Sequence, residues 1–508
     1  MRASWRQIIF SAAVSLLAGL MMISSESLWI DEGQTLHFVS QPSLGAWFSE
    51  LLHNTKSEAQ MPLGMFVAWL GGKILGTSEW ALRATNLIWV TLGGVAVALT
   101  GRRLRLPELW PLFLLSPFLW FYANEARPYT MQICAGAWLL WVLGRAQDRG
   151  SVTAGDVALF GLWSFVGFGA SLLFAFAVLG ALAAGIVMWW QGRMRCAWSP
   201  RHWLALVLAA LVLGALGLYY LDTLRRGASG ARLWTVSPLN LCFALYELLG
   251  FSGLGPPRNE LRDLVRAPGQ LLHYVLQPRV LIGLGSLGAF SIIAAWRLWR
   301  NRREPLPRWV GAAIVVTGAT LYLAAMVVKF PFWGRHLAPL LPFVVTLVAF
   351  AAHARGESGS RWSRHWLAFA LAIPLLVSAL FLRFGPAYRK DDYRGAARVA
   401  LRALETRRTI WWSADAEECA AYYGLTAARA AALGGRFLPC YPTRPEVLTN
   451  GPPPDVIFLS KPDVHDVQGF VQEYLRRPGY VLSGRLSAFE VWVSPVAAND
   501  PIWGRSPP

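Results

Sequence analysis

Two neighbouring carboxylates, Asp31 and Glu32, directly follow the first long apolar stretch of the sequence. Carboxylates placed side by side at a membrane surface lose hydration, which raises the pKa of at least one of them and suits a general base. The alternative is a solvated loop start whose side chains only cap the next helix. Position alone leaves both interpretations open.

A second pair of ionisable residues, Glu125 and Arg127, lies in the segment Tyr122-Ala-Asn-Glu-Ala-Arg-Pro-Tyr129 between two apolar stretches. Ionisable side chains at a membrane boundary are costly, and those that occur there are often functional. Arg127 could bind a phosphate through two parallel hydrogen bonds. The alternative is an internal Glu–Arg pair that orders the hairpin between two helices.

A compact cationic spot is formed by Lys329, Arg335 and His336 in the segment Lys329-Phe-Pro-Phe-Trp-Gly-Arg-His336. An anionic lipid headgroup or a diphosphate is its natural ligand. The alternative is that these side chains reach along the apolar surface to ordinary phospholipid headgroups.

These groups belong to a strongly apolar chain of 508 residues, of which 55% are hydrophobic and only 15% are charged. Because soluble domains usually carry about 25% charged residues, the composition excludes an ordinary cytosolic enzyme, a disordered protein and a disulfide-stapled scaffold. It predicts a polytopic membrane protein. The net charge is +18, but the basic residues form no single stripe. Membrane lipids are therefore the expected partners, and nucleic acid is not.

Eleven membrane spans are expected, because a span needs roughly 17–25 apolar residues. The run 155–190 is too long for one helix and is expected to form two, joined near Gly167–Ser171. The first span is interpreted as retained rather than cleaved as a signal peptide. The approximate spans are residues 7–24, 81–100, 107–123, 129–144, 155–170, 172–190, 202–221, 279–297, 309–328, 337–353 and 366–383.

The distribution of arginine predicts the orientation. With a cytoplasmic N-terminus, every inner loop is rich in arginine and the outer segments mix both signs, which is the positive-inside pattern. The odd number of spans then places the C-terminus outside. The first outer loop, residues 25–80, is expected to carry an amphipathic helix around 44–52 and an apolar helix over Met61–Gly76, both at the membrane surface.

The composition changes near Tyr388, where charges become frequent and apolar runs shorten. The transmembrane domain is therefore assigned to residues 1–387, and a small extracytoplasmic α/β domain to residues 388–508. Cys419 and Cys440 fall in this second domain, where they form either a disulfide or two buried thiols. The expected elements of the domain are a helix over Asp391–Thr406, strands over Thr409–Ser413 and Val456–Ser460, a helix over Val464–Arg476, and strands near Tyr480–Leu482 and Phe489–Val493.

Four segments resemble membrane glycosyltransferases of family 39, which includes the protein O-mannosyltransferases and the lipid A aminoarabinose transferase. They occur in the expected order between residue 1 and about residue 383, and it is the four together that make the resemblance specific. The segments are Trp29-Ile-Asp31-Glu32-Gly, Pro62-Leu63 followed by Gly76-Thr-Ser-Glu-Trp-Ala-Leu-Arg83, Asn124-Glu-Ala-Arg-Pro-Tyr129, and Arg335-His-Leu-Ala-Pro-Leu-Leu-Pro342.

The resemblance implies a C-type glycosyltransferase fold, a sugar donor carried on a polyprenyl phosphate, and an active site on the extracytoplasmic face of the bacterial inner membrane. It implies that Asp31 is the base and that Glu125 is a supporting acid. Glu32 stays a second catalytic candidate, because adjacent carboxylates can share a proton. By the same resemblance, Arg127 and Arg335 would bind the donor phosphate. The cationic spot adds Lys329 and His336 to the expected phosphate-binding residues.

No cofactor is certain. Many relatives have H-P-P-L where this chain has Gln60-Met-Pro-Leu63, Gln where it has Asn124, and Tyr where it has His336. These departures leave open a divalent metal and the acceptor, which could be a protein, lipid A or an envelope polysaccharide.

The chemistry agrees with these residues. Glycosyl transfer passes through an oxocarbenium-like state while a carboxylate activates the nucleophile. A phosphate leaving group needs cations rather than a protonating acid, and a single displacement inverts the anomeric centre.

Three alternative functions predict other sequence features. An oligosaccharyltransferase would carry W-W-D-x-G, which Trp411-Trp-Ser-Ala-Asp415 does not match. A lipid flippase predicts paired repeats and ionisable residues in mid-membrane, whereas here the charges cluster at one face. A membrane scaffold would tolerate the loss of Asp31.

Overall fold

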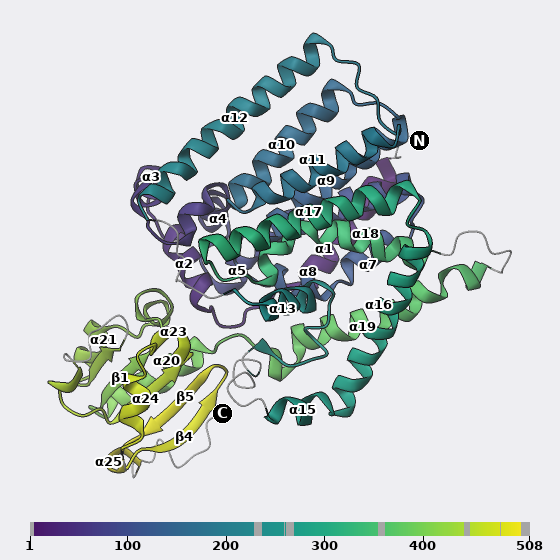
Figure 1. The fold of residues 1–508 in the computed structure, drawn as a ribbon. Helices are drawn as coiled ribbons and strands as arrows, with labels where there is room; N and C mark the ends of the chain where they lie inside the picture. Colours follow the sequence, from purple (N-terminus) through teal and green to yellow (C-terminus); the bar gives the residue numbers. More distant parts are fainter. Residues whose placement is uncertain are drawn as a thin grey trace. The chain divides into compact units, whose positions relative to one another are not determined.

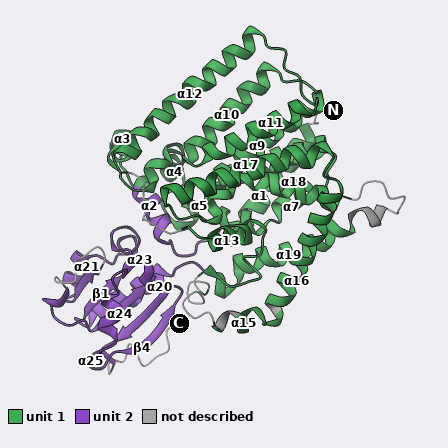
Figure 2. Cartoon of the chain, in the orientation of Figure 1, with its two compact units in different colours: residues 1–24, 38–388 green, residues 25–37, 389–508 purple. Residues whose placement is uncertain are grey.

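The computed structural model describes residues 5–227, 236–258, 260, 269–353, 361–440, 448–477 and 479–498. The chain divides into two compact units, which Figure 2 shows in different colours. The helical unit comprises residues 1–24 and 38–388, and the C-terminal unit comprises residues 25–37 and 389–508. The change of composition near Tyr388 predicted that residues 25–37 belong to the transmembrane domain. In the structure this segment, which carries Asp31 and Glu32, clusters with the C-terminal part of the chain.

Helices form at every predicted span (Figure 1). Among the described residues, seven helices are long and apolar enough to cross a membrane, and the chain is a multi-pass membrane protein. The helices at the predicted spans are α1 (Trp5–Met22), α5 (Glu79–Ala84) with α6 (Asn86–Leu104), α7 (Leu109–Leu114) with α8 (Pro117–Ala123), α9 (Tyr129–Arg149), α10 (Ala154–Ala170), α11 (Phe174–Trp190), α12 (Pro200–Arg225), α16 (Pro278–Arg300), α17 (Pro305–Val328), the 3₁₀ helix η2 (Gly334–Leu340) with α18 (Leu341–Ala352), and α19 (Arg361–Phe384).

Two breaks in these helices have clear local causes. The third predicted span is divided at Pro117, because a proline inside a helix would lack an N–H and clash with the preceding turn. Pro117 instead occupies the first position of α8, where no N–H is needed. The predicted division of 155–190 is confirmed: α10 ends at Ala170 and α11 begins at Phe174. A Cβ atom on Gly167 would lie 2.3 Å from the Phe174 ring, so only glycine allows the two helices to turn this tightly.

The segment between α1 and α5 contains α2 (Ile30–Val39), α3 (Leu44–His53), η1 (Ser57–Gln60) and α4 (Pro62–Leu75). The two helices that the sequence predicts here, α3 and α4, are present. Trp47 and Leu51 of α3 share a buried cluster with Met65 and Trp69 of α4. Their position at the membrane surface stays a prediction. Further helices not predicted by the sequence are α13 (Pro238–Leu248), α15 (Gly269–Val275) and η3 (Pro386–Tyr388).

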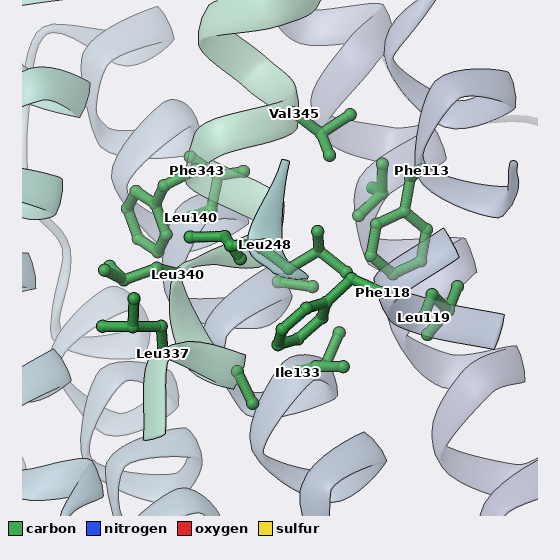
Figure 3. Packing of buried hydrophobic residues seen from close by; sticks show 14 of the residues in the cluster. Phe113, Phe118, Leu119, Ile133, Leu140, Leu248, Leu337, Leu340, Phe343 and Val345 are labelled. Atoms are coloured by element: carbon green, nitrogen blue, oxygen red, sulfur yellow. The ribbon is translucent and has the colours of Figure 1, made fainter. Parts of the chain in front are cut away.

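The core of the helical unit lies where α8, α9, α13 and η2 meet. Phe118, Ile133, Leu248 and Leu340, one from each of these elements, belong to a single buried cluster (Figure 3). A Cβ atom on Gly136 of α9 would lie 2.2 Å from the Pro339 carbonyl oxygen. Small residues of this kind let helix backbones approach closely in membranes, where packing rather than water exclusion drives association. This core fixes the ends of the four elements that carry the candidate site.

The C-terminal unit is built on a five-stranded sheet of order β2-β1-β3-β5-β4. β1 pairs in parallel with β2 and β3, whereas β5 pairs antiparallel with β3 and β4. Its elements are α20 (Tyr393–Glu405), β1 (Thr409–Ser413), the π-helical turn η4 (Ala416–Ala420), α21 (Ala427–Ala432), β2 (Arg436–Pro439), β3 (Val456–Ser460), α23 (Pro462–His465), α24 (Phe470–Leu475), β4 (Val481–Leu486), β5 (Phe489–Val493) and α25 (Pro495–Ala498).

One expectation for this unit needs correction, and the structure decides between the two alternatives left open for its cysteines. The single helix predicted over 464–476 is two short helices, because the Asp466 carboxylate accepts the backbone N–H groups of Val471 and Gln472 and so starts a new helix. The disulfide alternative is also excluded, since Cys419 and Cys440 are free, buried thiols. They belong to two different hydrophobic clusters, which contain Trp412 and Trp411, respectively. Since adjacent residues of a strand face opposite sides of the sheet, the two thiols lie in different cores.

Candidate functional site

The two carboxylates of the first motif have different environments, although both lie in the first turn of α2. The Glu32 side chain has no exposed surface, and its Oε1 atom accepts a hydrogen bond from Lys390 Nζ at 2.9 Å. Its Oε2 atom lies 3.4 Å from the backbone N of Trp29. Asp31 is half-buried. The structure therefore fixes Glu32 in a buried ion pair and leaves Asp31 the more accessible of the two.

Glu125 lies in a rigid turn between α8 and α9 and is 1% exposed. Asn86 Nδ2 donates to the carbonyl oxygens of Ala123, at 3.1 Å, and Glu125, at 2.5 Å. Asn124 Oδ1 accepts a hydrogen bond from Ser24 N at 2.7 Å. The conformation of the predicted motif is thus set by amide side chains, which satisfy backbone groups that the bilayer could not.

Arg127 is paired with a residue that sequence analysis did not connect to it. Its Nη1 atom lies 2.6 Å from Glu58 Oε1, and both side chains are 2% exposed. Glu58 lies in η1, next to α4. The pair therefore ties the turn after α8 to the segment before α4. Phosphate binding by Arg127 stays a prediction.

A charged network that the sequence did not reveal lies beside Glu125. Arg258 donates through Nε to Glu247 Oε1 at 2.7 Å and through Nη2 to the Tyr122 hydroxyl at 2.9 Å. Its Nη1 atom lies 4.0 Å from Glu125 Oε1, and its guanidinium carbon lies 4.2 Å from the centroid of the Phe121 ring.

The negative charge of Glu247 stabilises the charged form of Arg258. Although burial alone would lower the pKa of Arg258, the negative charge of Glu247 raises it and keeps the guanidinium charged. The available signal was Glu247 itself, an acidic residue inside the apolar stretch Leu239–Leu249. Such a residue is costly unless it is paired.

The cationic spot of the sequence divides in the structure. Lys329 is exposed at the end of α17, whereas Arg335 and His336 are half-buried in η2. The backbone N–H of Trp333, the residue before η2, donates to His336 Nδ1 at 3.2 Å. This contact caps the start of η2. The Gly334 N–H donates to Glu247 Oε2 at 3.1 Å, and a Cβ atom at this glycine would lie 2.3 Å from that oxygen.

The helical unit therefore connects two predicted site segments. The turn with Glu125 and the start of η2, next to Arg335, are linked through Arg258 and Glu247. Asp31 and Glu32 belong to the other unit, so the prediction that all these residues line one cavity is not tested. Within the described ranges, no group of three His, Cys, Asp or Glu side chains could hold a metal ion.

Comparisons with known proteins address the fold. No model of a protein family matches this sequence, and no curated protein matches it. Among solved structures, ArnT from Cupriavidus metallidurans in the apo state has a TM-score of 0.52 and 12% identity over 97% of this chain and 98% of that chain. The same protein bound to undecaprenyl phosphate gives 0.48 and 12% over 96% and 98%. Arabinofuranosyltransferase AftD from Mycobacteria gives 0.46 and 16% over 97% of this chain and 40% of that chain. Over nearly its whole length, this chain has the C-type glycosyltransferase fold of ArnT.

Proposed function

We propose that this protein is an integral membrane glycosyltransferase that moves a sugar from a polyprenyl-phosphate donor to a hydroxyl acceptor on the extracytoplasmic face. The observation that carries the proposal is the difference in burial between the two carboxylates of the first motif. Glu32 is buried against Lys390 while Asp31, its neighbour, stays accessible. A general base needs a carboxylate that substrate can reach, and Asp31 meets this condition.

The reaction is a single displacement. The Asp31 carboxylate takes the proton of the acceptor hydroxyl, whose oxygen attacks the anomeric carbon. The bond from that carbon to the phosphate oxygen breaks, and its electron pair leaves with the polyprenyl phosphate. The product is the glycosylated acceptor with an inverted anomeric centre.

The charge that develops on the leaving phosphate needs fixed cations. Arg258 suits this role because buried Glu247 and the Tyr122 hydroxyl hold it, while 34% of its side chain remains exposed. Arg335 is assigned the same role from its motif, and Lys329 and His336 are proposed as further donor-binding residues from their place in the same segment. Glu125 is assigned to orient Arg258, given the 4.0 Å separation of the two side chains.

The test is reconstitution of the purified chain in liposomes with a panel of polyprenyl-phosphate pentoses and hexoses. Release of polyprenyl phosphate and appearance of the sugar on protein, lipid A or polysaccharide acceptors would support the proposal. Movement of the lipid-linked sugar across the bilayer without any transfer would instead indicate a flippase and contradict it.

A further inference from the structure

The sheet of the C-terminal unit has an edge where open α/β domains commonly bind ligands. β1 is central, with β2 on one side and β3 on the other, and all three are parallel. In such sheets the ligand crevice lies beyond the carboxyl ends of the strands where the strand order reverses. Here that edge is formed by the turn η4, which follows β1, and by Lys461, which follows β3.

Residues 25–37 of the same chain lie against this edge. A Cβ atom on Gly33 of α2 would lie 2.6 Å from Cys419 Sγ and 3.2 Å from Glu418 Cβ, both in η4. The ammonium group of Lys461 lies 5.1 Å from the centroid of the Trp29 ring. Residues 25–37 therefore contact the edge of the sheet, formed by η4 and Lys461, where a ligand would be expected.

Several further contacts hold the segment before α2. The Leu28 N–H donates to the Tyr423 hydroxyl at 2.8 Å. The Arg394 N–H donates to Ser27 Oγ at 3.1 Å, and Arg394 Nη2 donates to the Ser25 carbonyl oxygen at 2.7 Å. The chain is thus fixed on the N-terminal side of Asp31.

The ion pair between Glu32 and Lys390 fixes the chain on the other side of Asp31. The two side chains are 0% and 9% exposed, so neither charge is screened by bulk water. Removing one partner of such a pair leaves the other charge buried and uncompensated. In the sequence, Asp31 lies between the contacts of residues 25–28 and the ion pair of Glu32.

We propose that Lys390 is a positioning residue for Asp31, and that the C-terminal unit holds the first turn of α2 in the geometry that transfer requires. The inference rests on the proposed function, because it takes Asp31 as the base. Proton transfer needs hydrogen-bond reach, and a displacement of about 1 Å can cost roughly 10²-fold in rate. Residues 389–508 would thus contribute to catalysis by keeping this carboxylate in place.

The first test asks whether the segment lies where the proposal needs it. In the Gly33→Cys variant, the introduced thiol faces Cys419, and oxidation by diamide should join the two sulfurs while diamide is reduced to its hydrazine. Mass spectrometry of the full-length protein in nanodiscs should find the linked peptides. The Gly33→Cys, Cys419→Ser variant should form no link, and Cys440, in another core, should stay a free thiol. Absence of the link from the first variant would overturn the placement.

The second test asks whether Lys390 acts on turnover. Lys390→Met should lower kcat by about 10²-fold and change KM for the donor less than about threefold, a split that a general loss of folding would not give. Combining it with Glu32→Gln should recover part of kcat, because no buried charge is then left alone. Lys73→Met, at an exposed lysine of α4, is the matched control and should behave as wild type.

The outcomes separate the two proposals. Unchanged kcat in Lys390→Met, or a raised donor KM with unchanged kcat, overturns the positioning role while the transferase remains. If the wild type transfers no sugar although the Gly33→Cys link forms, the proposed function has failed and the positioning role with it.

Discussion

Each unit of this chain buries a carboxylate beside a cation, and the two pairs differ in what they leave accessible. In the C-terminal unit, Glu32 and Lys390 are 0% and 9% exposed. In the helical unit, Glu247 is buried to a similar degree at 4%, yet Arg258 keeps 34% of its side chain exposed. We call an ion pair closed when both side chains are buried, as in Glu32 and Lys390, and open when its cation stays partly exposed, as in Glu247 and Arg258. A closed pair can only fix the backbone that carries it. An open pair fixes its cation and can also present that cation to an anionic ligand.

The pair of Arg127 with Glu58 belongs to the closed class, since both side chains are 2% exposed. The sequence left two roles open for this arginine, binding of a phosphate and an internal pair with Glu125. The geometry favours a role in ordering the turn, with Glu58 rather than Glu125 as the partner. Arg127 and Arg258 therefore offer a direct comparison, because both are arginines beside a buried carboxylate and only one is open.

The largest expected effect concerns Asp31, the half-buried neighbour of the buried pair of Glu32 and Lys390. Asp31→Asn should lower kcat by about 10²–10⁴-fold, because asparagine keeps the size of the side chain but cannot accept the proton. Donor affinity should change little. The measurement is turnover in the reconstituted assay, beside Asp222→Asn, at an exposed aspartate of α12 whose partner is Arg226. Turnover within about threefold of wild type in Asp31→Asn combined with Glu32→Gln would show that these carboxylates are structural.

The next largest effect should separate closed from open arginines by stability. Arg127→Met leaves Glu58 buried without its cation, which should cost about 3–5 kcal/mol of unfolding free energy. Adding Glu58→Gln should recover much of that loss. The measurement is denaturant unfolding in detergent, with Arg485→Met as the control, because an exposed pair such as Arg485 and Glu490 contributes about 0–1 kcal/mol. A variant that keeps wild-type stability but loses donor affinity would assign Arg127 to the phosphate instead.

A smaller effect is expected on donor binding. Arg258→Met, tested together with Arg258→Lys in case the first variant folds poorly, should weaken polyprenyl-phosphate binding by about 1.5–3 kcal/mol, the contribution of a hydrogen bond to a charged group. Arg335→Ala should have a similar effect if both arginines hold the phosphate. Binding can be followed by tryptophan fluorescence in nanodiscs, with exposed Arg308→Met as the control. Unchanged affinity in Arg258→Met and Arg258→Lys alike would mean that the open pair is only structural.

The sequence predicted those parts of the fold and of the candidate site that depend on neighbouring residues, and it missed those that depend on contacts between residues far apart in the chain. The spans and the strands β1 and β3 were predicted because a continuous apolar run is a local signal. Strand β2, Arg436–Pro439, was missed because it is short and contains both an arginine and a proline. Asp31 was identified as a candidate from its motif, but Lys390 was not, since it lies 358 residues from Glu32. Arg258 was not identified from the sequence, because Tyr122 in α8 and Glu125 in the following turn, which it contacts, are distant in sequence.

The smallest expected effect concerns Asp415, a buried carboxyl for which the described residues supply no ion-pair partner. Burial raises the pKa of Asp415 to about 7; the N–H of Cys419 opposes this shift, and the negative charge of Glu418 adds to it. In the unfolded chain the pKa of an aspartate is about 3.9. Between these values the folded state holds a proton that the unfolded state has released, so stability falls as pH rises from about 4 to about 7.

The Asp415→Asn variant tests this dependence, because asparagine does not titrate. Its unfolding midpoint should vary less than that of wild type between pH 5 and pH 7. The difference in unfolding free energy should be at most about 1.4 kcal/mol for each pH unit. The measurement is thermal unfolding of the full chain followed by tryptophan fluorescence, with Asp148→Asn, at an exposed residue of the helical unit, as the control. If wild type and Asp415→Asn show the same dependence on pH, the buried carboxyl is balanced by its surroundings, and the contrast between carboxylates with and without a buried cation would be weaker than the geometry indicates.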